Sequence, residues 1–306
     1  MTNAVNLASA AGTGFFRNKI INGALEIAQR GTSGTSGYLA DRWQAINTSA
    51  QSISSDAPDG FSSSLEFTSS SATFPFMSQR IERINSYDLA GKTVTLSFWA
   101  KSVSGSSNLY VELYRANSND NFSGVTFETG ASAVLATTPS TSWTYYTATF
   151  TLSSSATTGL EVRIIRNNAS ASSTRVTGVQ FEIGSQATPF ERRNYQQELA
   201  MCQRYTVVLY NTGTPANGFW GTMYSTTAGR VWTKLPVTMR ASPTLTATNG
   251  NGTFEILAVA TVATATIQNV FTAPNCVTFD GTLFSSTANI GHGIAYRGPG
   301  IISAEL

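Results

Sequence analysis

The sequence has few charged residues, one histidine and two cysteines. Asp, Glu, Lys and Arg make up 12% of its 306 residues, about half the usual share, and the net charge is +2. This balance excludes the concentrated positive surface that nucleic-acid binding normally needs. Cys202 and Cys276 are too few for a disulfide framework. His292 lies between two glycines, so we expect a loop residue and no histidine metal cluster.

Long apolar runs are also absent. No stretch approaches the ~18 residues of a membrane span, and the first residues lack the basic start and apolar core of a signal peptide. We therefore expect a protein that is made in a cytoplasm and does not insert into a membrane.

Hydroxyl and aromatic side chains take the place of charge. Ser and Thr fill roughly a quarter of the chain, far above average usage, and aromatic residues contribute 11% along its whole length. Threonine and aromatic residues favour strands, while Ser, Gly and Asn favour the turns between them. The composition predicts an all-β protein.

Alternation of apolar and polar residues marks the strands between about residues 44 and 184. In residues 94–101, Val94, Leu96, Phe98 and Ala100 face one way, and the residues between them face the other. Residues 109–115, 143–152, 160–164 and 179–183 repeat the pattern. Short strands with polar loops between them predict an antiparallel two-sheet sandwich.

A short helix is expected after this sandwich. Its apolar stripe falls at steps of four, three and three residues, Pro189 precedes it, and Asn194 is a plausible N-cap. The stripe consists of Tyr195, Leu199, Cys202 and Tyr205. A helix this short needs a partner for its apolar side, so we expect Tyr195, Leu199 and Cys202 to form or underlie an oligomer contact.

A second β unit is predicted from about residue 205, with strands in 205–210, 218–224, 230–237, 243–248, 254–257, 265–271 and 301–306. The expected organisation is therefore an attachment arm (1–18), a first β-sandwich (19–188), a connecting helix (189–204) and a C-terminal β-sandwich (205–306).

Catalytic and metal-binding patterns are sparse. Two carboxylates placed by the fold are enough for a glycosidase, and Glu112, Glu161 and Glu182 all alternate onto the polar face. A solvated face or an interface is the favoured explanation for them. Residues 56–60 and 117–121 could offer oxygen ligands to calcium, but neither matches a defined calcium loop and both form good turns. We expect no cofactor and no enzyme, with calcium the open alternative.

One group of side chains on the polar face of the first sandwich favours binding. It combines aromatic rings with charged and amide groups: Trp99, Tyr110, Tyr114 and Tyr145 with Lys101, Glu112, Glu161, Arg163, Gln180 and Glu182. Such rings can stack on sugars, and such polar groups can bind sugar hydroxyls. The same mixture suits a subunit interface or packing beneath a loop, so both interpretations stay open.

Several motifs resemble those of bacteriophage tail-fibre and virion appendage proteins. The strongest is Gln180-Phe-Glu-Ile-Gly-Ser-Gln-Ala-Thr-Pro-Phe-Glu-Arg-Arg193 followed by Glu198-Leu-Ala-Met-Cys-Gln-Arg-Tyr205. Residues 21–30, 38–43, 235–243 and 303–306 also fit, and 94–101 resemble a strand of carbohydrate-binding jelly rolls in the same proteins.

The resemblance implies a jelly-roll-like first sandwich and a structural virion protein, such as a tail fibre. It would form a homotrimer with itself, contact other virion proteins, be assembled in the host cytoplasm and contribute to host attachment. Two alternatives are a glycan-binding or glycan-cleaving adhesin and a capsid decoration protein. The motifs are structural, and they carry over no catalytic residue.

Overall fold

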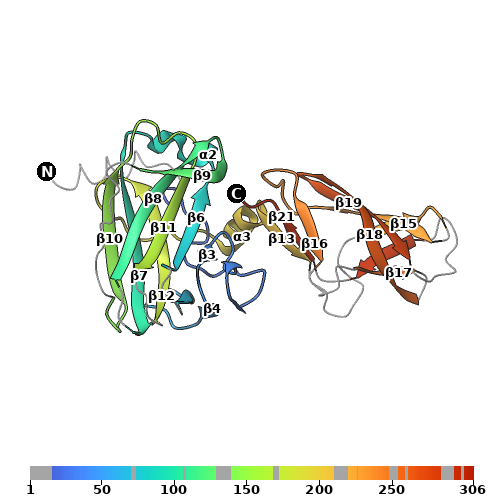
Figure 1. Ribbon diagram of the computed structural model, residues 1–306, viewed down its shortest axis with the longest axis horizontal. Helices are drawn as coiled ribbons and strands as arrows, with labels where there is room; N and C mark the ends of the chain where they lie inside the picture. The colour runs from blue at the N-terminus through green and yellow to red at the C-terminus, as the bar shows by residue number, and fades with distance from the viewer. Residues whose placement is uncertain are drawn as a thin grey trace. The chain divides into compact units, whose positions relative to one another are not determined.

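The chain divides into two compact units, residues 1–198 with 306 and residues 199–305, and each is described by itself. In the computed structural model (Figure 1), the described residues are 16–69, 74–105, 108–128, 139–167, 172–209, 220–225, 227–247, 254–258, 261–283, 293–297 and 300–306.

Two six-stranded sheets form the first unit, and all pairings between their described strands are antiparallel. Sheet A has the order β1 (Ser33–Gly34), β4 (Ala50–Ser54), β5 (Ser64–Ser69), β12 (Ser172–Ile183), β7 (Thr93–Ser104), β10 (Thr144–Thr151). Sheet B has the order β2 (Gly37–Tyr38), β3 (Gln44–Ile46), β6 (Phe76–Ile81), β11 (Leu160–Asn167), β8 (Asn108–Ser118), β9 (Asn121–Phe127).

The hydrophobic core lies between these sheets and follows the predicted alternation. Sheet A contributes Leu96 and Phe98 from β7, and sheet B contributes Val111 from β8 and Val162 from β11; all four are fully buried. Each of these strands therefore has an inner face in the core and an outer face pointing away from it. A short helical piece, α2 (Arg83–Ser86) with η1 (Tyr87–Leu89), joins β6 to β7.

The segment of residues 16–27 covers the part of β12 that β5 leaves unpaired. The Lys19 N–H donates to the Phe181 carbonyl (2.8 Å), and the Val179 N–H donates to the Gly23 carbonyl (2.9 Å). Asn22 has a positive φ of 56°, and its side chain bonds the backbone of Ile27 and Asp41. The segment thus protects a strand edge, and it turns at Asn22 and Gly23.

The connecting helix α3 (Tyr195–Gln203) begins where the sequence predicts. The Asn194 side chain accepts a hydrogen bond from the Gln196 N–H (3.0 Å), which makes Asn194 the N-cap. The helix contains the division between the two units. No helix in the described part of the chain is long and apolar enough to span a membrane.

The second unit contains a three-stranded sheet and a closed barrel. The sheet has the order β13 (Thr206–Leu209), β21 (Gly300–Ser303), β16 (Thr244–Ala247). The barrel has the order β14 (Trp220–Met223), β15 (Ala228–Lys234), β19 (Cys276–Leu283), β18 (Thr261–Ala273), β17 (Phe254–Ala258), β20 (Gly293–Arg297).

The all-β class, the jelly-roll-like sandwich, the short helix and the second β unit are confirmed. In detail, the second unit closes into a barrel beside a small sheet, where the sequence predicted a sandwich. Two of its strands, β19 and β20, were not predicted. Residues 1–15 of the expected arm lie outside the described residues.

Candidate functional site

The outer face of sheet B carries three rows of side chains that run across its strands. Neighbouring strands in each row are in register. The middle row is polar, with Gln44, Ser78, Arg163 and Glu112. One flanking row is apolar and aromatic, with Ile46, Phe76, Ile165 and Tyr110. The other is mixed, with Arg80, Glu161, Tyr114 and Phe127. Adjacent strands are about 4.8 Å apart, so each row is about 14 Å long.

Arg163 lies at the centre of this face, between two rings. Its guanidinium carbon is 4.9 Å from the Phe76 ring centroid and 4.0 Å from the Tyr114 ring centroid. Its Nη2 lies 2.8 Å from Glu161 Oε2. The stacking and the ion pair together fix the planar guanidinium in one orientation.

Glu161 is fully buried although its strand position faces outward. Its second oxygen, Oε1, is 3.8 Å from Arg80 Nε. The carboxylate therefore lies between two guanidinium groups whose side chains are 21% and 19% exposed. Burial of a charge is costly unless it is paired, and the two arginines supply that pairing.

Several buried polar atoms of this face have no hydrogen-bond partner among the described residues. They lie on three adjacent strands, and they are Gln44 Oε1, Ser78 Oγ, Arg80 Nε, Glu161 Oε1 and Arg163 Nε. Buried polar groups are normally satisfied. A cluster of unsatisfied donors and acceptors on one face is the pattern expected where a ligand or bound water completes the bonding.

Tyr114 adds a directed hydroxyl. It donates to Glu112 Oε2 at 2.7 Å, and the Phe127 ring packs against its ring edge at a centroid distance of 5.4 Å. Burial, and then the hydrogen bond to Glu112, raise the pKa of Tyr114 to about 12. The hydroxyl therefore stays protonated at any ordinary pH. Phe127 remains 42% exposed at the end of the row.

The outer face of sheet A holds the other half of the predicted group. Trp99 and Tyr145 are in register and their ring centroids are 5.3 Å apart. A loop after β4 covers much of this face: Phe61 lies against Gly178, where an added Cβ would come within 2.6 Å of its ring and 3.1 Å of the Trp99 ring. Gly178 also has a positive φ of 62°, so glycine is required there on both grounds.

Asp56 fixes that loop to the strands beneath. Its carboxylate accepts hydrogen bonds from Lys101, from Arg175 and from Trp143 Nε1, the last at 2.9 Å. The bonds from Lys101 and Trp143 lower the pKa of Asp56 to about 2. Lys101 is therefore part of an ion network that holds a loop.

Gln180 and Glu182 are buried beneath residues 184–193. The Gln180 amide donates to Glu182 Oε1 (2.8 Å), and Gln180 Oε1 accepts from the Glu191 N–H (2.7 Å). Glu182 accepts from the Thr188 N–H (2.8 Å). Both side chains support the path of the chain as it leaves the sandwich.

The expectation that all these residues share one face is therefore wrong. Tyr110, Tyr114, Glu112, Glu161 and Arg163 lie on sheet B, and the rest lie on sheet A. Alternation tells which residues of a strand point the same way, but it carries no information on which sheet the strand joins. Sheet membership depends on pairing between distant segments.

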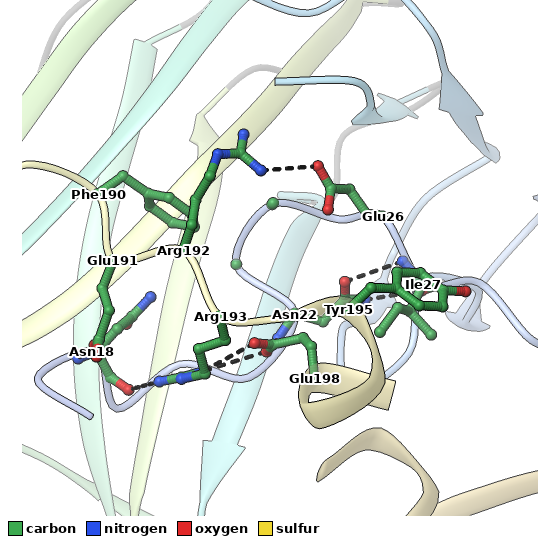
Figure 2. Close-up of a pocket in the computed structure, with 12 residues that line it drawn as sticks. Asn18, Asn22, Glu26, Ile27, Phe190, Glu191, Arg192, Arg193, Tyr195 and Glu198 are labelled. Atoms are coloured by element: carbon green, nitrogen blue, oxygen red, sulfur yellow. Dashed lines mark hydrogen bonds and ion pairs between the residues drawn. The ribbon is translucent and has the colours of Figure 1, made fainter. Parts of the chain in front are cut away.

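Arg193 and Glu198, from the motif at residues 180–205, bind the N-terminal segment. They line a small recess of about 30 Å³, enough for one or two water molecules (Figure 2). Arg193 donates from Nη1 to the Ile20 carbonyl (3.0 Å) and from Nη2 to the Asn18 carbonyl, and its Nη1 lies 3.2 Å from Glu198 Oε1. Glu198 also accepts from the Asn22 N–H. This part of the motif therefore has a structural task.

The predicted oligomer-contact residues differ in exposure. Tyr195 is 53% exposed, Leu199 is half-buried and Cys202 is fully buried. Among the described residues, only Tyr195 of the three presents most of its side chain to solvent. Neither Cys202 nor Cys276 forms a disulfide.

Metal-binding groups are not found in the part of the chain that the structure describes: no three His, Cys, Asp or Glu side chains are placed to hold an ion. Asp56 is committed to its ion network, and Asp120, in the turn 117–121, accepts from the Arg83 N–H at 2.6 Å. His292 lies outside the described residues.

Sequence reasoning missed Gln44, Phe76, Ser78, Arg80 and Phe127 of the sheet B face. Residues 76–81 do not alternate cleanly: Met77, Ser78 and Gln79 are all buried, and Ser78 and Gln79 are polar on opposite faces, so the sequence shows no period-two pattern. The signal that remained was the pair of aromatic residues Phe74 and Phe76, which bracket Pro75.

Comparison with known proteins finds a family match within the first unit. Residues 36–171 match the family model described as "Carbohydrate binding domain". This range contains every strand of sheet B, whereas β1 and β12 of sheet A lie outside it. A comparison with curated proteins finds no match.

Three solved structures show a distant likeness. The CBM22-1 xylan-binding domain of Xyn10C from Paenibacillus barcinonensis is 13% identical with a TM-score of 0.38, over 56% of this chain and 96% of that one. A putative sugar binding protein from Bacteroides thetaiotaomicron gives 14% and 0.38, over 55% and 100%. The enzymatically active domain of tailspike protein 4 from bacteriophage CBA120 gives 12% and 0.37, over 55% and 22%. Likenesses of this size carry no argument about function.

Proposed function

We propose that the first unit binds neutral carbohydrate on the outer face of sheet B, without catalysis. The observation that carries the proposal is the polar middle row with its unsatisfied buried atoms, flanked by aromatic rings, within the range that matches a carbohydrate-binding family model. Sugar hydroxyls both donate and accept, so they match the mixture of donors and acceptors on this face.

The charge of the face favours a neutral ligand. Arg80 and Arg163 are balanced by Glu112 and Glu161, and the central carboxylate is already paired. An acidic sugar would place its carboxylate near Glu161 and gain little from arginines that are already engaged. Rings on both sides of the polar row can stack on the apolar faces of sugar rings.

A matched pair of aromatic residues tests the proposal. Phe127 on sheet B is 42% exposed and Tyr145 on sheet A is 40% exposed. In affinity electrophoresis through soluble xylan, β-glucan and mannan, Phe127→Ala should weaken retardation at least tenfold, and Tyr145→Ala should leave it unchanged. The reverse result, or no retardation of the wild type by any neutral polysaccharide on a broader glycan array, would overturn the proposal.

A place in a phage particle stays a prediction. It is supported by the motifs at residues 21–30, 38–43 and 180–205, and it implies a homotrimer of this chain that contacts other virion proteins. A density map of the intact particle would test it, because such a map shows whether this chain lies in a tail fibre, a baseplate or a capsid surface.

A further inference from the structure

A patch on the outside of the barrel combines two exposed rings with an ion pair. Trp232 is 48% exposed and Tyr224 is 51% exposed, whereas their neighbours Val231 and Met223 are almost fully buried. Because alternate residues of a strand point to opposite faces, the Trp232 ring lies on the outer face of β15, and Tyr224 lies exposed in the bend directly after β14.

Arg230 and Asp280 lie in the same patch. They are in register on β15 and β19, and they form a two-point pair with Nε–Oδ1 at 2.6 Å and Nη2–Oδ2 at 3.0 Å. The hydrogen bond to Asp280 is the main cause that raises the pKa of Arg230, and the nearby Tyr224 adds to it. Half of the Arg230 side chain stays exposed (50%).

Strand pairing and the ion pair hold the patch in place. β15 is paired along its length with β19, and its residues 229–232 are also paired with β14, in a closed barrel. The two-point ion pair with Asp280 holds the planar guanidinium of Arg230 in one orientation. From Ala228, which bonds Tyr224, to Trp232 the strand rises about 13 Å, so the rings can contact one extended ligand at two points.

We propose that this barrel patch, made of Tyr224, Arg230, Trp232 and Asp280, is a second carbohydrate site. The ion pair leaves it with no net charge, so a charged partner gains nothing from it. Exposed rings can stack on the C–H face of a sugar, and the half-exposed Arg230 guanidinium can donate to its hydroxyls, while the buried Asp280 carboxylate holds that guanidinium in place.

A protein partner is the alternative occupant of the patch. A stable protein interface buries about 800 Å² on each side, whereas one or two exposed rings are enough to stack on a sugar. Light scattering of the Trp232→Ala variant separates the two occupants.

The inference is independent of the sheet B site, and the experiment separates the two. The full-length chain is compared on a microarray of neutral hexose, pentose and N-acetylhexosamine oligosaccharides as wild type, Phe127→Ala, Trp232→Ala and the double variant. We expect Phe127→Ala to keep binding to some glycans, and Trp232→Ala to remove these signals at least tenfold. Lys234→Ala, at an exposed position two residues along β15, is the matched control and should change nothing.

Each outcome of this experiment has a distinct meaning. If Trp232→Ala binds every glycan as the wild type does, the patch is no carbohydrate site. If it dissociates an oligomer in light scattering, the patch is a protein interface. If Phe127→Ala changes nothing while Trp232→Ala abolishes binding, the sheet B proposal fails and the barrel site stands. Circular dichroism of each variant confirms that the fold is retained.

Discussion

Glu161 determines the balance of charge on the outer face of sheet B, because it is the buried partner of both Arg80 and Arg163. Replacing it by glutamine keeps the shape and removes the charge. Breaking a buried pair typically costs about 3–5 kcal/mol. The arginines are partly exposed and can rehydrate, so we expect Glu161→Gln to lower the free energy of unfolding by about 2–3 kcal/mol, measured by urea denaturation.

Glu112 offers the control for that change. It lies on the same outer face, in the neighbouring row, but is only half-buried, and a glutamine oxygen can still accept from the Tyr114 hydroxyl. Glu112→Gln should therefore cost less than about 1 kcal/mol. If the two variants lose the same free energy of unfolding, the buried Glu161 contributes no more to stability than the half-buried Glu112.

Asp56 makes stability depend on acid pH. Its pKa falls from an ordinary 3.8 to about 2 in the folded state. A lowered carboxyl pKa means that the unfolded chain binds the proton first, so the stabilisation is complete above about pH 4 and is lost as the pH falls towards 2. The free energy of unfolding should decrease in this window. Asp56→Asn should flatten that decrease, whereas Asp59→Asn, at an exposed position of the same loop, should not.

At the scale of elements, two adjacent arginines have different tasks. The side chain of Arg193 is 4% exposed and holds the backbone of the N-terminal segment, while that of Arg192 is 46% exposed and pairs with Glu26 (Figure 2). Arg193→Ala leaves two buried carbonyls and Glu198 without this partner, so we expect a loss of about 2–4 kcal/mol. Arg192→Ala should cost less than about 1 kcal/mol.

Hydrogen exchange locates the effect of these two changes. In Arg193→Ala the amides of residues 18–23 should exchange faster than in the wild type, because the segment loses its attachment to the chain leaving the sandwich. In Arg192→Ala they should not. If amide exchange instead becomes faster throughout the first unit, the segment opens only together with the whole unit.

The strands of the sandwich could be predicted because each repeats one simple pattern. Residues 94–101 fall within β7, 109–115 within β8 and 160–164 within β11, with the expected side chains in the core. The helix start was predictable as well, since Asn194 is a side chain suited to capping. These signals are local, and local geometry decides them.

The candidate site could be predicted only in part, because it depends on pairing between distant strands. Tyr110, Tyr114, Glu112 and Arg163 were found from alternation. Ser78 and Arg80 became part of the site only when β6 paired with β11. Trp99 and Tyr114 lie on different sheets for the same reason: β7 pairs within sheet A and β8 within sheet B. The burial of Glu161 could not be predicted either, since it requires arginines from a neighbouring strand and from its own.

At the scale of the whole molecule, the helix residues that we expect at the trimer contact differ in how far they are exposed to a partner. Tyr195 is 53% exposed and available to a partner, whereas Cys202 is already fully buried within its own chain. We expect a trimer in light scattering at micromolar concentration. Tyr195→Ser should shift it towards monomer, because it removes an aromatic side chain of the kind that anchors interfaces. Cys202→Ser should lower the melting temperature by placing a hydroxyl among buried groups and leave the trimer formed. A wild-type chain that is monomeric at these concentrations would contradict the trimer itself. A trimer that Tyr195→Ser leaves intact would show that α3 is no oligomer contact and that the trimer forms through another surface.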